Sequence, residues 1–101
     1  MQINRQKERE IDMILQIFEN VNGDNREVLI DNMSAFSIHG DCFEYVVNNQ
    51  STRLKKVDVE QIWKEVYLLN DSGKTIKRVY KKETALDSLK DVSFKSFDWK
   101  E

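Results

Sequence analysis

The stretch EVYLLNDSGKTIKRVYK, residues 65–81, gives the clearest structural signal in the chain. Two runs rich in Val, Ile, Leu and Tyr flank residues 70–73, where Asn and Asp side chains can bond to their own backbone. Gly73 accepts the positive φ of a type I turn followed by a bulge. These features predict a β-hairpin whose opposing pairs are Leu69–Thr75, Leu68–Ile76 and Val66–Arg78.

A second hairpin is predicted over residues 35–47, because Gly40 and Asp41 suit a two-residue turn with Gly at its first central position. Its expected pairs are Ile38–Phe43, Phe36–Tyr45 and Ser34–Val47. In this register the large apolar residues other than Val46 share one face, and the other face carries Ser37, His39, Cys42 and Glu44. A shift of one residue would scatter the apolar set over both faces. Residues 52–57 are expected to return as a third strand, with Leu54 near Tyr45.

Residues 5–21 are predicted to form an amphipathic helix, since apolar residues recur there at helical spacing. Its apolar stripe consists of Ile11, Ile14, Leu15, Phe18 and Val21. The following Asn22 and Gly23 provide a stop signal. Residues 28–30 are expected to form a short strand.

Two shorter helical segments are predicted further along the chain. Helix and strand compete over residues 58–69, because helical spacing and a capping signal overlap with the strand of the first hairpin. The compromise is a short helical turn at 58–63, with a strand that begins near Lys64. Residues 84–90 are predicted to form a short helix with Thr84 as its cap. The tail that follows, residues 92–101, is expected to form either a last edge strand or an irregular segment against the body of the domain.

These elements predict an α+β fold. An N-terminal amphipathic helix would pack on an antiparallel β-meander, followed by a short C-terminal helix and an aromatic tail. The 101 residues are expected to form a single domain, 1–101, with 40% hydrophobic residues for its core. The chain has no apolar run near the roughly 20 residues that a membrane span needs, and the first 12 residues do not resemble a signal peptide. The single cysteine, Cys42, fits a reducing compartment, so we expect a soluble, cytoplasmic protein.

The charges are unevenly distributed along the chain, although the net charge is only −2. Residues 10–50 hold eight Asp and Glu against Arg26 alone, a balance of −7. Residues 51–82 hold nine Lys and Arg against four Asp and Glu, a balance of +5. If the two blocks fold onto different surfaces, one surface is acidic and the other basic.

The sequence contains few features typical of an enzyme active site. The chain has no phosphate-binding glycine loop, no paired CxxC and no nucleophile elbow, and its residues do not form a zinc ligand set. His39 and Cys42 are predicted to lie opposite each other across the second turn, with Cβ atoms about 5 Å apart. A thiolate beside an imidazole is a nucleophile in principle, but the favoured reading is a turn-flanking pair without a catalytic role. No enzymatic activity, cofactor or metal is expected.

Three sets of residues are candidates for binding. The acidic set is Asp24, Glu27, Asp31, Asp41 and Glu44. The aromatic set, whose side chains suit interface hot spots, is Trp63, Phe94, Phe97 and Trp99. The basic set, which could contact nucleic acid phosphates, is Arg53, Lys55, Lys56, Lys77, Arg78, Lys81 and Lys82.

The leading hypothesis is a small protein-binding module that covers a partner's surface through its acidic residues. The chain is small, and its many Lys, Asn, Ile and Asp residues suggest an AT-rich genome. By analogy with small proteins of such genomes, it could be a phage or mobile-element inhibitor or adaptor, for example against a host defence nuclease. The first alternative is a nucleic-acid-binding accessory protein that uses the basic set. The second is a small-ligand-binding domain in which a helix lies across a meander. Exposed strand edges and the aromatic tail also permit a homodimer.

Overall fold

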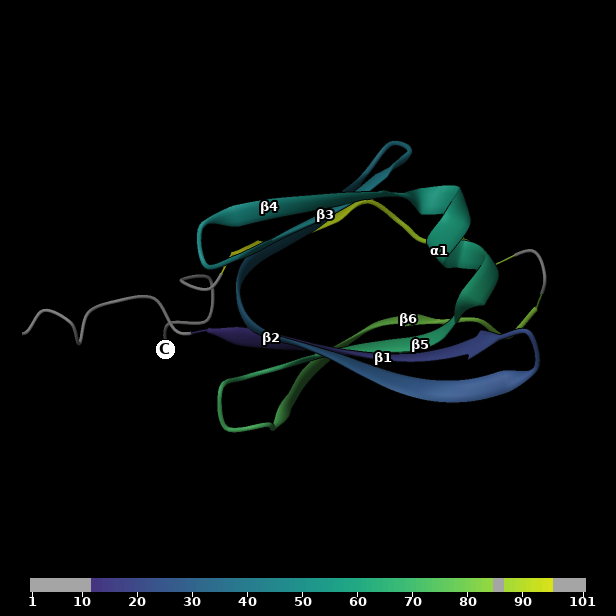
Figure 1. Cartoon of the computed structure of the whole chain (residues 1–101), viewed down its shortest axis with the longest axis horizontal. Helices are drawn as coiled ribbons and strands as arrows, with labels where there is room; N and C mark the ends of the chain where they lie inside the picture. Colours follow the sequence, from purple (N-terminus) through teal and green to yellow (C-terminus); the bar gives the residue numbers. More distant parts are fainter. Residues whose placement is uncertain (1–11, 85–86, 96–101) are drawn as a thin grey trace, which may run out of the picture.

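The computed structural model describes residues 12–84 and 87–95, and these fold into antiparallel strands with one short helix (Figure 1). The elements, in chain order, are β1 (Met13–Val21), β2 (Asp24–His39), β3 (Cys42–Val47), β4 (Gln50–Lys55), α1 (Lys56–Ile62), β5 (Trp63–Leu69), β6 (Thr75–Lys81) and β7 (Val92–Lys95). The strands form one sheet in the order β4-β3-β2-β1-β5-β6, and β7 also pairs with β2. Within the described ranges, no helix is long and apolar enough to cross a membrane.

The sheet is folded into two layers by a sharp bend in β2, its longest strand. Asn32 has a positive φ of 57°, and the pairing of β2 with β3 shifts register between Met33 and Ala35. Both irregularities bend a strand strongly. We call β1, β5, β6 and residues 24–31 of β2 the lower layer. The upper layer comprises residues 33–39 of β2 with β3, β4 and β7, and α1 connects the two layers at one side (Figure 1).

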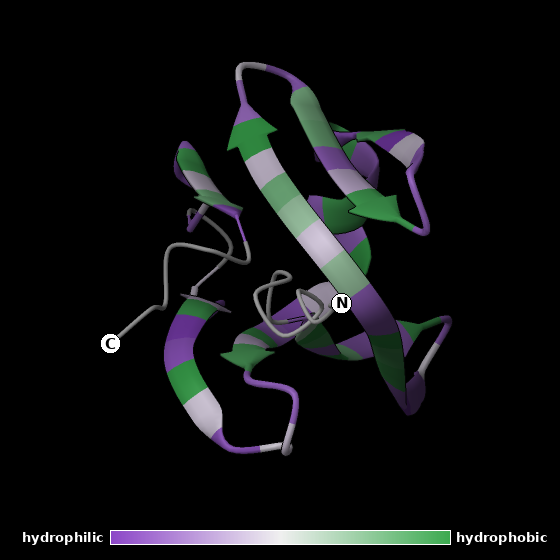
Figure 2. Ribbon diagram, turned by 90° about the vertical axis from the view of Figure 1, so that its left-hand side faces the viewer, coloured by the Kyte–Doolittle hydropathy of each residue, from purple (hydrophilic) through white to green (hydrophobic). Residues whose placement is uncertain are grey.

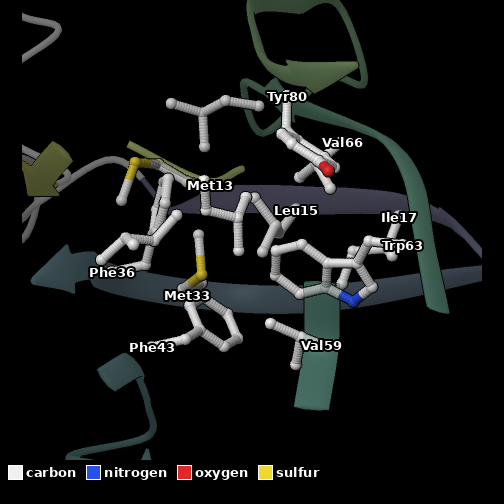
Figure 3. Close-up of a cluster of buried hydrophobic side chains, with 13 residues drawn as sticks. Met13, Leu15, Ile17, Met33, Phe36, Phe43, Val59, Trp63, Val66 and Tyr80 are labelled. Carbon is white, nitrogen blue, oxygen red and sulfur yellow. The ribbon is translucent and has the colours of Figure 1, made fainter. Parts of the chain in front are cut away.

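The hydrophobic core fills the space between the layers (Figure 3). Along β1, buried side chains alternate with half-buried ones from Met13 to Asn20. In Figure 2, hydrophobic and hydrophilic segments alternate along several strands of the ribbon. The fully enclosed residues come from both layers and include Met13, Leu15, Met33, Phe43, Val66 and Leu68. Phe43 of the upper layer meets Trp63 of the lower layer edge to face, with ring centroids 5.0 Å apart. This contact ties the two layers together.

The predicted N-terminal helix is wrong, and with it the α+β class: the described chain is mostly β-sheet. Residues 13–21 form β1, while residues 5–11 of the predicted helix lie outside the described residues. In β1, Met13, Leu15 and Ile17 are buried, whereas the residues between them are half-buried. Because both faces of this strand carry apolar side chains, a helical spacing can be selected from them by chance. Pairing with β2 on one side and β5 on the other stabilises residues 13–21 as a strand.

The two predicted hairpins are present, and their registers differ from the predictions where bulges occur. In the second hairpin, Ile38–Phe43 and Phe36–Tyr45 are confirmed, as is the pairing of His39 with Cys42. Val47 lies opposite Met33 instead of Ser34 because of the register shift before Ala35. In the 65–81 hairpin, Leu69–Thr75 is confirmed, but two register shifts place Lys77 opposite Leu68 and Tyr80 opposite Val66.

The segment that joins the layers largely follows the predictions. The third strand is β4. Leu54 lies opposite Phe43, and Thr52, two residues earlier in β4, lies opposite Tyr45. The predicted helical turn at 58–63 corresponds to α1, and β5 begins at Trp63, one residue before the expected start.

The predicted helix at 84–90 is wrong for the residues described there. Residues 87–90 adopt no regular structure, and the Asp87 carboxylate accepts hydrogen bonds from the backbone N–H groups of Glu83 (2.7 Å) and Thr84 (2.9 Å). These local bonds replace a helical turn. The tail then forms an edge strand, β7, as one of the two predicted outcomes. Phe97 and Trp99 lie outside the described residues.

Candidate functional site

The outward face of the lower layer combines apolar and acidic side chains, and we call it the lower outer face. It comprises residues of β1, β2, β5 and β6 that point away from the core: Ile14, Gln16, Phe18, Glu27, Leu29, Asp31, Glu65, Tyr67, Arg78 and Lys81. The antiparallel register sets their positions. Gln16 lies between Leu29 and Tyr67, and Phe18 lies between Glu27 and Glu65.

Contacts between neighbouring side chains organise this face. The Phe18 and Tyr67 rings meet edge to face with centroids 6.1 Å apart. Gln16 Nε2 donates a hydrogen bond of 2.8 Å to Glu27 Oε2. The Tyr67 hydroxyl donates to the Glu65 carboxylate, and this bond, with partial desolvation, raises the pKa of Tyr67. Polar and aromatic side chains therefore hold each other in place across three strands.

Leu29 is the most exposed apolar side chain of the lower outer face. It is 53% exposed, although it lies in the middle of a strand. Glu27 precedes it and Asp31 follows it on the same side of β2, because alternate residues of a strand share a face. An accessible apolar side chain is thus framed by two carboxylates.

The predicted acidic set does not form one patch. Glu27 and Asp31 belong to the lower outer face, but Asp24 alternates to the opposite side of β2. Asp41 lies in the turn after β2, and Glu44 lies on the outside of the upper layer. Glu44 is also engaged locally, since a hydrogen bond from the Ser51 hydroxyl and the Arg53 guanidinium at 3.5 Å lower its pKa. The expectation of a single acidic surface is therefore corrected to a pair of carboxylates.

The predicted aromatic set is divided between the core and the tail. Trp63 is only 3% exposed, so its ring is packed inside the domain and not offered to a partner. Phe94 is half-buried and stacks on Phe36 with ring centroids 5.4 Å apart. Phe97 and Trp99 lie outside the described residues. The aromatic pair that points outward is instead Phe18 and Tyr67, and the wrong prediction of an N-terminal helix concealed the position of Phe18.

The predicted basic set lies at the two ends of the sheet. Arg53, Lys55 and Lys56 belong to β4 and the start of α1, whereas Lys77, Arg78 and Lys81 belong to β6, with Lys82 directly after it. Several of these cations have internal partners. Lys82 Nζ donates to the Glu60 carbonyl at 2.9 Å, Lys81 Nζ lies 3.8 Å from Glu83, and Lys77 Nζ lies 5.7 Å from the Phe94 ring centroid. The set is not a continuous stripe.

A hollow of about 690 Å³ lies on the outside of the upper layer, and we call it the upper hollow. Its lining residues come from β2, β3, β4 and the segment that leads into β7: Ser37, Ile38, His39, Cys42, Glu44, Arg53, Asp91, Val92 and Ser93. The four predicted polar residues of the second hairpin, Ser37, His39, Cys42 and Glu44, do share this face. Asp91 and Ser93 were missed, because no local signal predicts that β7 pairs with β2 beside them.

Asp91 anchors one end of the upper hollow. Its Oδ1 accepts a hydrogen bond of 3.3 Å from the backbone N–H of Gly40, and its Oδ2 lies 3.7 Å from His39 Nδ1. His39 in turn lies opposite Cys42 across the turn. The His39 side chain is 88% exposed, so solvent surrounds it. Across the described ranges, no group of three or more His, Cys, Asp and Glu residues could hold a metal ion.

Comparison with known proteins gives no relative: no family model, no curated protein and no solved structure matches this chain. The surfaces described above are therefore the basis for a functional proposal.

Proposed function

We propose that this chain is a protein-binding module that docks its lower outer face onto a partner with a basic surface. The supporting observation is the exposed Leu29, which lies next to the Phe18–Tyr67 pair and between two carboxylates. Protein interfaces typically combine an apolar or aromatic centre with a polar rim. Tyr and Phe anchors cost little conformational entropy because few side-chain torsions need to be fixed.

The charges of the lower outer face indicate the kind of partner. Glu27, Asp31 and Glu65 contribute three carboxylates, and the two cations of this face, Arg78 and Lys81, lie on β6 at the edge away from Leu29. A basic partner surface would be attracted to this face, and charge complementarity accelerates association more than it strengthens the final complex. Binding of such a partner should therefore be faster at low salt than at high salt.

Site-specific crosslinking tests which face binds. A photoreactive amino acid is placed at Leu29, and in a matched control at Val57 of α1, which is equally accessible at 55% against 53%. After irradiation in a native lysate, we expect one crosslinked protein band at position 29 and none at position 57. Equal crosslinking from both positions would show that the lower outer face is not the docking surface.

Charge reversal tests the electrostatic part of the proposal. The captured partner is titrated against Glu27→Lys and against the control Asp41→Lys, whose carboxylate lies in the turn after β2. Glu27→Lys should slow association several-fold at low salt, whereas Asp41→Lys should leave the rate unchanged. If both variants slow association equally, only the net charge of the protein matters and the face plays no specific part.

A second candidate function, small-ligand binding, is favoured by the upper hollow. Its volume of about 690 Å³ lies within the range of ligand pockets, and its polar groups, including Arg53, His39 and Ser93, converge on one space. A ligand bound there should raise the melting temperature. Ser37→Phe, which places a ring at a residue that lines the hollow, should abolish that rise while leaving the free protein folded. A ligand-induced rise that persists in Ser37→Phe would place the ligand elsewhere.

A further inference from the structure

The lower layer has two edges that pair with no other strand of the described chain. Residues 24–31 of β2 pair with β1 on one side only, because β3 and β7 pair with β2 beyond its bend. At the opposite end of this layer, β6 pairs with β5 only. Figure 1 shows the four strands of the lower layer in this arrangement, with β2 and β6 as the outer ones. An open edge presents unpaired backbone N–H and C=O groups that can accept another strand.

The two edges carry opposite charges. The β2 edge holds the carboxylates of Asp24, Glu27 and Asp31. Its one cation, Arg26, is held by the buried Glu19 carboxylate at 3.0 Å and so does not balance them. We call this stretch, residues 24–31, the acidic edge.

The β6 edge is the counterpart. It holds Lys77, Arg78 and Lys81, and Lys74 lies in the turn directly before it. Lys81 has an ion pair with Glu83 at 3.8 Å, so Lys74, Lys77 and Arg78 carry the positive charge of this edge. Residues 74–81 contain no carboxylate, and we call them the basic edge. Proteins commonly protect open edges by giving them charges of one sign, so that copies repel each other. Here the two edges of one layer would attract each other between copies.

We propose that the acidic edge of one copy of this chain pairs with the basic edge of a second copy. Strand direction permits this pairing. Successive strands of the lower layer, β2, β1, β5 and β6, alternate in direction, so β6 runs opposite to the first half of β2. When a second copy is placed beside the first in the same orientation, the new neighbours are antiparallel, as are all the other pairs of the sheet.

Charge also selects a register for the joint. If Glu27 lies opposite Arg78, Asp31 lies opposite Lys74, because each is four residues further along in opposite directions. Glu27 and Arg78 both point outward in the free molecule, as a directly opposed antiparallel pair requires. The bulges of β6 flank Lys77 and Arg78, which therefore form the regular centre of the basic edge.

This joint uses a different surface on each copy and leaves one acidic and one basic edge free at the ends. Such heterologous contacts continue into longer assemblies unless a ring closes. The assembly should therefore grow beyond a dimer as the protein concentration rises. This inference does not rest on the proposed partner-binding function, because it is read out on the purified chain alone.

The test measures mass by analytical ultracentrifugation over a concentration series. We expect concentration-dependent species larger than a dimer at about 0.01 M salt and their loss at about 1 M, where the Debye length falls to about 3 Å. A wild-type chain that stays monomeric at low salt and the highest soluble concentration would overturn the proposal. A distribution that stops at a dimer would also overturn it, since that indicates a two-fold contact.

Two charge-reversed variants supply the decisive control. Glu27→Lys/Asp31→Lys places cations on both sides of the two ion pairs of the joint, and Lys74→Glu/Arg78→Glu places carboxylates on both sides. Each variant alone should raise the dissociation constant at least about tenfold, since two exposed ion pairs become repulsive. An equimolar mixture of the two should regain association, because every joint then pairs opposite charges again.

Circular dichroism first establishes that both variants are folded, which is expected because the changed side chains are exposed. If the folded variants associate as well as the wild type, or if their mixture does not associate, the edges are not the joint. The four-fold variant that carries all these changes is a further check. In this variant the charges of both ion pairs are reversed on both edges, so opposite charges meet again and the chain should associate like the wild type.

Discussion

Phe43 is the side chain on which the attachment of the two layers depends most. It is 1% exposed, and its ring contacts Trp63 at 5.0 Å, Tyr45 at 5.5 Å and Phe36 at 6.3 Å between centroids. Phe43→Leu keeps an apolar side chain but removes all three ring contacts. With each pair worth about 0.5–1 kcal/mol and a residual cavity added, the variant should lose about 2–4 kcal/mol of unfolding free energy. That is a large part of the roughly 5–15 kcal/mol typical of a domain.

Phe18→Leu is the matched control for this substitution. Phe18 is half-buried on the lower outer face and contacts one ring, Tyr67, at 6.1 Å, so the loss should be about 1 kcal/mol or less. Urea denaturation of both variants, followed by circular dichroism, gives the two free energies from the midpoints at a common slope. If Phe43→Leu costs no more than Phe18→Leu, the layers are not held together by this aromatic contact and the reasoning fails.

Three further outcomes are expected. Tyr80→Phe should leave unfolding free energy unchanged or raise it by about 1 kcal/mol, because the buried Tyr80 hydroxyl has no hydrogen-bond partner among the described residues; a loss of stability in urea denaturation would contradict this. Arg26→Ala should lower the unfolding free energy by about 1–3 kcal/mol, because it leaves the buried Glu19 carboxylate without its cation. Adding Glu19→Gln to the same chain should recover most of that loss. A double variant no more stable than Arg26→Ala would be inconsistent with the ion pair. Two hydrogen bonds from backbone N–H groups lower the pKa of Asp87 below 3.8, so its contribution to stability is present above that pH and is lost as the pH falls through the lowered value. Asp87→Asn should therefore be less stable than the wild type at pH 7. Acid titration of both proteins should show this difference closing below pH 3.8.

The turns and hairpins of this fold could be predicted from sequence because their determinants are local. Gly40 has a φ of 61° and Gly73 one of 89°, as the turn chemistry requires. The pairs nearest each turn, His39–Cys42, Ile38–Phe43 and Leu69–Thr75, were therefore correct. Errors accumulated with distance from the turn. Each bulge adds one residue to one strand, and nothing in the local composition marks its position.

The N-terminal strand could not be predicted by the same means. Glu19 occupies an inward position of β1, where an alternating pattern would place an apolar residue, and Ile14 and Phe18 occupy outward ones. The carboxylate is tolerated because Arg26 of the neighbouring strand reaches it. Since the compensating residue belongs to another strand, the pattern of β1 alone points to a helix.

The candidate surfaces were partly accessible to sequence reasoning. The grouping of Ser37, His39, Cys42 and Glu44 on one face follows from a single hairpin and was correct. Asp91 joins them only because β7 returns to β2 after a long excursion of the chain. Likewise, the charge imbalance between the two halves of the chain was visible in the sequence, but its arrangement on opposite edges of one layer depends on the order of strands in the sheet.

The central position of β1 has a consequence for how the chain reaches this structure. The pairs β2–β3 and β3–β4 join strands that follow each other directly, so these hairpins can form as soon as their residues are available. The β1–β5 pair is different, because Leu15 must wait for Leu68, far along the chain. During synthesis, the inward row of β1 therefore stays without one of its two neighbours until most of the domain has been made. Closing this pair is expected to be the slow step of folding, and β1 is the strand most exposed to wrong partners before it closes.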